Sequence, residues 1–153
     1  MSDTVVDSKN AALRLLARRE HSRHELLQKL TRRYGAAEVQ VALDQLEEDG
    51  YLSEQRFTAS FLRMRVAQGH GLIRIRFDLK QKGVSPEVLE QVLNEASVDW
   101  YAQALEVVRR RFRGVVSADY KEQARRTRYL MQRGFSMDEA RHAVQQFTRE
   151  EDA

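Results

Sequence analysis

The chain contains no cysteine, only one proline and seven glycines among its 153 residues. The lack of cysteine excludes disulfides, thiolate metal sites and a cysteine nucleophile, and it suits a reducing compartment. No window approaches the run of about 20 apolar residues that spans a membrane, and the mean hydropathy is −0.63. The first ten residues lack the basic start and apolar stretch of a secretory signal. We therefore expect a cytoplasmic protein without a membrane anchor.

The scarcity of proline and glycine leaves few interruptions, which favours helices, and the glycines fall at the ends of patterned segments. Ser22 with Glu25, and Ser136 with Glu139, have the spacing of capping boxes at helix N-termini. Pro86 follows a serine and fits the first position of a helix, where its missing amide hydrogen costs nothing. These three helix starts predict an all-α fold.

The helix boundaries recur along the chain. A glycine that is followed two residues later by a serine occurs at 83–85 and again at 134–136. Leu79 and Leu130 each lie four residues before that glycine, and Leu30 precedes a glycine in a looser copy. A period of about fifty residues holds three helices with short connections. We therefore predict three tandem three-helix repeats, resembling helix-turn-helix units, at residues 8–52, 53–97 and 98–150.

One segment conflicts with this prediction when it is taken alone. Residues 73–80 alternate apolar and polar side chains, as a half-buried strand does. Their counterparts at 23–34 and 121–133 have helical spacing instead, and a lone strand has no pairing partner in the chain. We predict a helix here as well.

Aromatic and aliphatic residues at helical spacing are assigned to the core rather than to base stacking. The assignment covers Leu13, Leu16, Leu27, Leu30, Phe57, Phe61, Phe77, Val92 and Val144. We therefore expect no platform on which single-stranded bases could stack.

Charge is distributed unevenly, although the formal net charge is only +3. Residues 9–35, 56–83 and 100–133 each carry a net charge of +6, and the segments that follow them are acidic. Because the basic segments share the period of the repeats, stacked repeats would align them along one surface that could hold a polyanion. The alternative is that basic and acidic helices pair with one another and keep the protein soluble.

Arginine supplies 21 of the 26 basic residues. Its planar fork suits bidentate contacts with phosphate or carboxylate better than the lysine ammonium does. Coding bias explains such a composition equally well.

The spacing of some cations is also notable. Arg76 and Lys80 share a helix face, as do Arg14 and Arg18, and each pair would repel unless an anion lay between its members.

No pattern predicts a catalytic, nucleotide-binding or metal site. The segment Gly69-His70-Gly71 lacks the length and the Lys-Ser/Thr ending of a phosphate loop, and we interpret it as a helix-ending turn. The four histidines lack the spacing of paired metal ligands. The acidic run at 47–49 ends a helix before Gly50 and is interpreted as solvated surface, not as an acid and base pair. We expect no enzymatic activity and no cofactor.

Four stretches of the sequence form a distinctive set of motifs. They are Leu-Leu-Ala-Arg-Arg-Glu-His-Ser-Arg-His-Glu-Leu at 15–26, Gly-Tyr-Leu-Ser-Glu-Gln-Arg-Phe at 50–57, Gly-Leu-Ile-Arg-Ile-Arg-Phe-Asp-Leu-Lys-Gln-Lys-Gly-Val at 71–84 and Arg-Thr-Arg-Tyr-Leu-Met-Gln-Arg-Gly-Phe-Ser at 126–136. Together they resemble the RecX family of bacterial proteins that modulate the RecA recombinase. The resemblance extends over nearly the whole chain.

This resemblance implies a curved, elongated molecule of three three-helix repeats that lies in the groove of the RecA filament on DNA. Strand exchange, ATP hydrolysis and coprotease activity of RecA would then fall, which links the chain to DNA repair, recombination and the SOS response. The implied partners are the RecA filament and single-stranded or duplex DNA, and we expect a monomer. The candidate contact residues, chosen from the motifs and from shared helix faces, are Arg74, Arg76, Lys80, Lys82, Arg126 and Arg133.

Two other functions stay open at this point. A helix-turn-helix transcription regulator would insert one helix into the major groove, and sequence-specific duplex binding would identify it. A helical adaptor would bind a protein partner with little dependence on salt, whereas phosphate contacts weaken steeply as salt rises.

Overall fold

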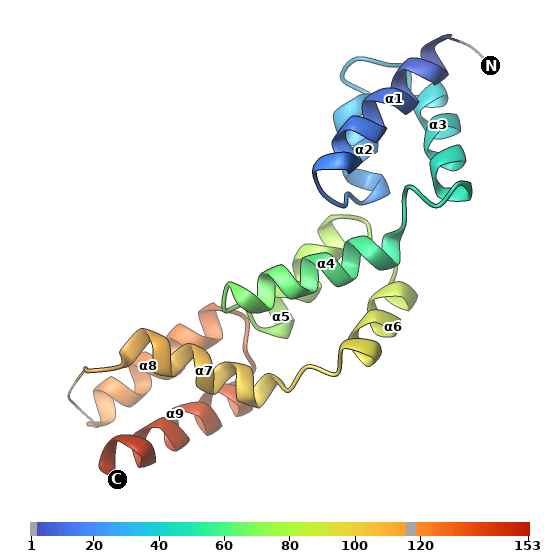
Figure 1. The fold of residues 1–153 in the computed structure, drawn as a ribbon. Coiled ribbons are helices and arrows are strands. Elements are labelled where there is room, and N and C mark those ends of the chain that lie inside the picture. Colours follow the sequence, from blue (N-terminus) through green and yellow to red (C-terminus); the bar gives the residue numbers. More distant parts are fainter. Residues whose placement is uncertain (1–2, 116–118) are drawn as a thin grey trace. The chain divides into compact units, whose positions relative to one another are not determined.

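The computed structural model describes residues 3–115 and 119–153, and throughout this part of the chain every regular element is an α-helix (Figure 1). The helices are α1 (Asp3–Arg18), α2 (Arg23–Leu30), α3 (Ala36–Glu48), α4 (Glu54–Ala67), α5 (Leu72–Gln81), α6 (Pro86–Ala96), α7 (Trp100–Phe112), α8 (Tyr120–Gln132) and α9 (Met137–Asp152). The predicted all-α fold of three-helix repeats is confirmed.

The helix starts that the sequence marks are formed by the expected contacts. Ser22 Oγ accepts a hydrogen bond from the Glu25 amide at 3.1 Å, and a Glu25 carboxylate oxygen accepts one from the Ser22 amide at 3.0 Å. Ser136 and Glu139 form the same capping box before α9, and α6 begins at Pro86. Two further caps, the aspartates before α7 and α8, were not predicted.

The segment with strand-like alternation is α5, as predicted. Residues two apart on a helix point about 200° apart, so an alternating pattern supplies two nearly opposite apolar faces. Ile75 and Leu79, four residues apart, are fully buried, whereas Ile73 and Phe77 are each 59% exposed. The assignment of Phe77 to the core is therefore wrong, because the packed face of α5 takes only one of these two sets.

The chain forms two compact units. Unit 1 comprises Met1–Phe61 and Leu79–Glu95, and unit 2 comprises Leu62–Asp78 and Ala96–Ala153. The boundary passes through α4 and α5. Each unit therefore combines one complete three-helix repeat with part of the middle repeat.

Each complete repeat has its own core, in which all three helices pack together (Figure 1). In unit 1, α1, α2 and α3 enclose a core of alanine, leucine and valine. In unit 2, α7, α8 and α9 enclose a core that also contains Phe112, Phe135 and Phe147. Of the predicted core residues, Leu30, Phe57, Phe61, Val92 and Val144 are buried. Leu13, Leu16 and Leu27 are partly buried and pack against the core of unit 1.

Candidate partner-binding surface

The six candidate contact residues fall into two groups. Arg74, Arg76 and Lys80 have exposed side chains on α5. The other three, Lys82, Arg126 and Arg133, are engaged in contacts inside the protein, and these are described one by one below.

The exposed face of α5 combines cations with large apolar side chains. Ile73 and Phe77 are one helical turn apart and well exposed, and Arg74 and Arg76 lie beside them in the sequence. Within this basic segment the single carboxylate, Asp78, lies 3.5 Å from Arg74 Nε and 3.8 Å from Arg65 Nη2. An exposed aromatic and aliphatic pair flanked by guanidinium groups is typical of a binding surface. The sequence pattern did not reveal it, because the same alternation fits a buried Phe77.

Lys82 joins the end of α5 to α2 within unit 1. Its Nζ lies 3.1 Å from a carboxylate oxygen of Glu25, whose side chain is only 11% exposed, and Arg19 approaches the same oxygen at 3.1 Å. Burial alone would raise the pKa of this carboxyl group. Hydrogen bonds from Arg19, the Ser22 amide and Lys82 outweigh burial and lower the pKa to about 2.

The turn after Lys82 is close to α2. Gly83 has a φ of +78° and lies against the His24 side chain, so that a Cβ at this position would lie 2.9 Å from His24 Cβ. Both the backbone conformation and the close approach therefore require glycine here.

We expect Glu25→Gln to lower the free energy of unfolding by about 2 kcal/mol at pH 7, because the amide keeps the cap but loses the charge that two cations face. The folded pKa of about 2 lies below the ordinary value of 4.5. The stabilisation is therefore complete above pH 4.5 and is lost as the pH falls towards 2. Urea unfolding at a series of pH values measures it.

Glu139→Gln is the matched control, since Glu139 caps α9 in the same way and forms no ion pair with a residue that the structure describes. We expect it to change stability by less than about 0.5 kcal/mol. Equal losses in the two variants at pH 7 would contradict a special role of the Glu25 charge.

Arg126 is fully buried in unit 2, where it bridges α8 and the end of α9. Its Nη1 lies 2.7 Å from a carboxylate oxygen of Glu151, and its Nε lies 3.4 Å from Glu122. The guanidinium group also lies 4.9 Å from the ring centroid of Phe147 and 5.4 Å from that of Phe112. Arg126 therefore has no exposed surface to offer a partner in this structure, and its contacts are those of an internal anchor.

Arg126→Ala should lower the free energy of unfolding by about 3 kcal/mol, because it leaves the partly buried Glu151 carboxylate without its cation and removes one of the two cations beside Glu122, which keeps Arg125 at 3.2 Å. Arg128→Ala, at an exposed position two residues later in α8, should change it by less than about 0.5 kcal/mol. Chemical denaturation followed by circular dichroism measures both. Similar values for the two variants would rule out the anchoring role.

Arg133 joins two turns within unit 2. Its guanidinium group donates hydrogen bonds to the backbone carbonyls of Gln68 and Gly69. In return, the amide of Gly71 donates to the Arg133 carbonyl at 2.8 Å. The amide of Ile73 likewise donates to the carbonyl of the following glycine, residue 134, at 3.0 Å. The segment at 69–71 is thus a helix-ending turn, as predicted, and it is held by the turn before α9.

The same turn contains His70, whose surroundings are electrostatically positive. Burial lowers the pKa of His70, and the nearby charges of Arg133, Arg65 and Arg74 lower it further. The imidazole is therefore kept in its uncharged form at neutral pH.

Several other arginines pair with acidic helices, as the alternative interpretation of the charge pattern expects. Arg23 of α2 lies 2.8 Å from Asp44 and 3.0 Å from Glu47 of α3, and these contacts outweigh burial and raise its pKa. Arg109 of α7 binds Glu150 of α9. The basic segments are therefore partly neutralised inside the fold.

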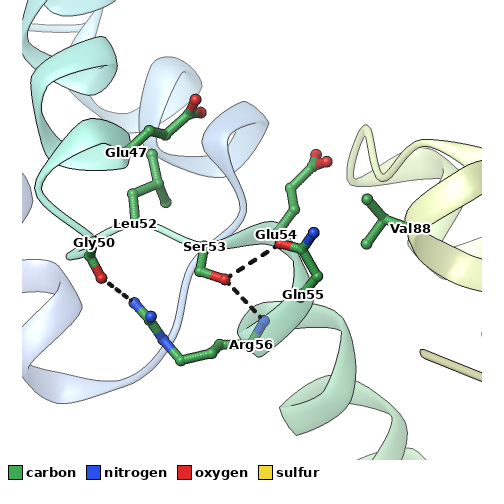
Figure 2. A pocket seen from close by; sticks show the side chains of 8 residues that line it. All are labelled: Glu47, Gly50, Leu52, Ser53, Glu54, Gln55, Arg56 and Val88. Carbon is green, nitrogen blue, oxygen red and sulfur yellow. Dashed lines mark hydrogen bonds between the residues drawn. The ribbon is translucent and has the colours of Figure 1, made fainter. Parts of the chain in front are cut away.

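A pocket of about 430 Å³ lies at the N-terminus of α4 in unit 1 (Figure 2). Arg56 donates a hydrogen bond to the Gly50 carbonyl at 2.7 Å, and Ser53 Oγ accepts one from the Arg56 amide at 3.2 Å. The side chain of Glu54 points away from that of Arg56 (Figure 2). Burial and the carboxylate of Glu47 raise the pKa of Glu54.

This pocket does not have the donor set of a metal centre. Its lining includes two carboxylates, those of Glu47 and Glu54. In residues 3–115 and 119–153, no group of three or more histidine, aspartate or glutamate side chains is placed to hold a metal ion. Over the same residues, no helix is long and apolar enough to cross a bilayer.

Three protein-family models match the chain in order. They describe the first, second and third three-helix domains of RecX and match residues 9–46, 53–93 and 97–144. Among curated proteins, the regulatory protein RecX of Halorhodospira halophila is 48% identical over 137 residues, which are 89% of this chain and 85% of the relative. The regulatory protein RecX of Pseudomonas fluorescens is 43% identical over 137 residues, covering 89% of this chain and 88% of the relative.

A solved structure has the same fold. The crystal structure of RecX from Lactobacillus salivarius matches with a TM-score of 0.80, covering 95% of this chain and 97% of that one. The sequence identity is 19%, so this likeness concerns the fold alone.

Proposed function

The chain belongs to the RecX family of regulatory proteins, and from this premise we propose that it binds the RecA filament on DNA and inhibits the recombinase, ATPase and coprotease activities of RecA. The observation that carries the proposal is the exposed face of α5, where Ile73 and Phe77 lie among Arg74, Arg76 and Lys80. Such a function places the chain in the cytoplasm with the DNA.

The chemistry of α5 fits a nucleoprotein. A filament offers phosphates and acidic protein surface, and both attract guanidinium groups. Naked DNA offers few apolar surfaces, whereas exposed aromatic and aliphatic side chains gain binding energy when a protein partner removes them from water. Arg74 and Arg76 would therefore provide the electrostatic part of the contact, and Phe77 the apolar part.

We assign the six candidate residues to two roles within this function. Arg74, Arg76 and Lys80 contact the filament directly. Lys82, Arg126 and Arg133 act indirectly, because each holds helices or turns of its own unit together. Substitutions in the second group would reduce binding only as far as they disturb the fold.

The test is RecA ATPase activity on single-stranded DNA, with and without the protein, over a series of salt concentrations. The wild-type chain should lower turnover. Half inhibition should require at least roughly tenfold more of the triple variant Arg74→Glu, Arg76→Glu, Lys80→Glu than of the wild type. In a plot of the logarithm of apparent affinity against the logarithm of salt concentration, the slope for this variant should be shallower by roughly three.

The matched control is the triple variant Arg32→Glu, Arg33→Glu, Arg149→Glu, which makes the same change in charge at exposed positions outside α5. It should retain most of the inhibition. An equal loss in both variants would indicate a non-specific effect of charge and contradict the role of α5. Sequence-specific footprints on duplex DNA without an effect on RecA would identify a transcription regulator instead.

A further inference from the structure

Helices α8 and α9 form a groove of about 390 Å³ on unit 2, which we call the α8–α9 groove. Its apolar lining includes Met131 of α8, together with Met137 and Val144 of α9. Val144 is buried at 3% exposure and belongs to the core, whereas the two methionines are 39% and 43% exposed. Tyr120, 87% exposed, also lines the groove. The groove therefore has apolar side chains that solvent still reaches.

The charge of the groove has one sign. Arg128 comes from α8 and Arg141 from α9, and no aspartate or glutamate is among the described residues that line it. Both arginines are exposed. Neither forms an ion pair within the described part of the chain, unlike Arg109 and Arg126 of the same unit. The groove therefore combines an apolar part with uncharged polar side chains and one cation on each of its two helices.

We propose that the α8–α9 groove binds an acidic amphipathic helix of the partner protein. A groove between two helices accepts the apolar face of a third, and methionines adapt their shape to its side chains. Carboxylates that flank the apolar face would then pair with Arg128 and Arg141. This inference rests on the proposed function, in which the partner protein is RecA, and it adds a second contact besides that of α5.

Single-stranded DNA fits the α8–α9 groove less well. Interfaces with nucleic acid are more strongly basic than this lining, which has two cations, and stacking of successive bases uses several aromatic faces. The lining contains one aromatic residue, Tyr120, against four apolar residues with no flat face. A protein helix with acidic flanks satisfies both the apolar and the charged side chains.

The absence of cysteine from the sequence allows a specific probe. Gln145→Cys places one thiol at the groove, where an environment-sensitive fluorophore is attached to the full chain. Purified RecA without DNA should change the fluorescence in a saturable way, and single-stranded DNA alone should not. A response to the DNA and none to RecA would overturn the proposal.

Two double variants, each made in the labelled chain, test the two parts of the contact. One double variant removes the cations and is Arg128→Glu, Arg141→Glu. The other makes the methionine positions polar and is Met131→Gln, Met137→Gln. Each should weaken the RecA-dependent fluorescence response by roughly tenfold. The matched controls change exposed positions outside the groove: the double variant Arg32→Glu, Arg33→Glu for charge and Met64→Gln for the methionines. They should leave the RecA-dependent response unchanged. Circular dichroism melting verifies that every variant is folded.

ATPase assays with the same variants separate the two proposals. Failure of the wild-type chain to inhibit RecA would overturn the proposed function. A second outcome would overturn only the proposal for the α8–α9 groove. In it, the wild-type chain inhibits RecA, the α5 triple variant does not, and both groove variants inhibit as well as the wild type. Weaker inhibition by the folded groove variants supports it.

Discussion

Contacts between consecutive repeats are the constraint on which the rest of this structure depends, because three helices in about fifty residues bury little apolar surface and are only marginally stable by themselves. In unit 1 the contact is polar, since Lys82 after α5 binds the Glu25 carboxylate in the capping box of α2. In unit 2 the backbone of Gly71 and Ile73 bonds to the turn before α9. Both contacts lie at the ends of helices, and the one in unit 2 uses backbone groups that have no partner inside their own helix.

These contacts determine which basic residues lie in the interior of the protein and which lie at its surface. Arg133 donates hydrogen bonds to the backbone carbonyls of Gln68 and Gly69. Arg126 lies between two carboxylates in the interior. Arg74, Arg76 and Lys80 project from α5 on its exposed sides. A count of cations in each basic segment therefore overstates the charge that a partner meets. The segregation of charge in the sequence serves the fold and the proposed binding surface at the same time.

The helices and the serine caps could be predicted because each depends on neighbours within about five residues, and the repeat could be predicted because these local signals recur along the chain. Ser22 with Glu25 is such a local signal, and the structure forms the capping box as expected. The burial of Arg126 could not be predicted, because its main partner, Glu151, is 25 residues away on another helix. The exposure of Phe77 was missed for a related reason. An alternating helix has two apolar faces, and only packing decides which of them turns inward.

The mixed chemistry of α5 bears on what the chain can distinguish. A surface of cations alone would bind any nucleic acid, because phosphate contacts carry no information about sequence or about bound protein. Ile73 and Phe77 are each 59% exposed beside those cations, and their burial is favourable only against another apolar surface. Under the proposed function, full affinity then requires phosphate or carboxylate and apolar protein surface together. Neither free DNA nor an uncharged protein supplies both, whereas a protein filament on DNA does.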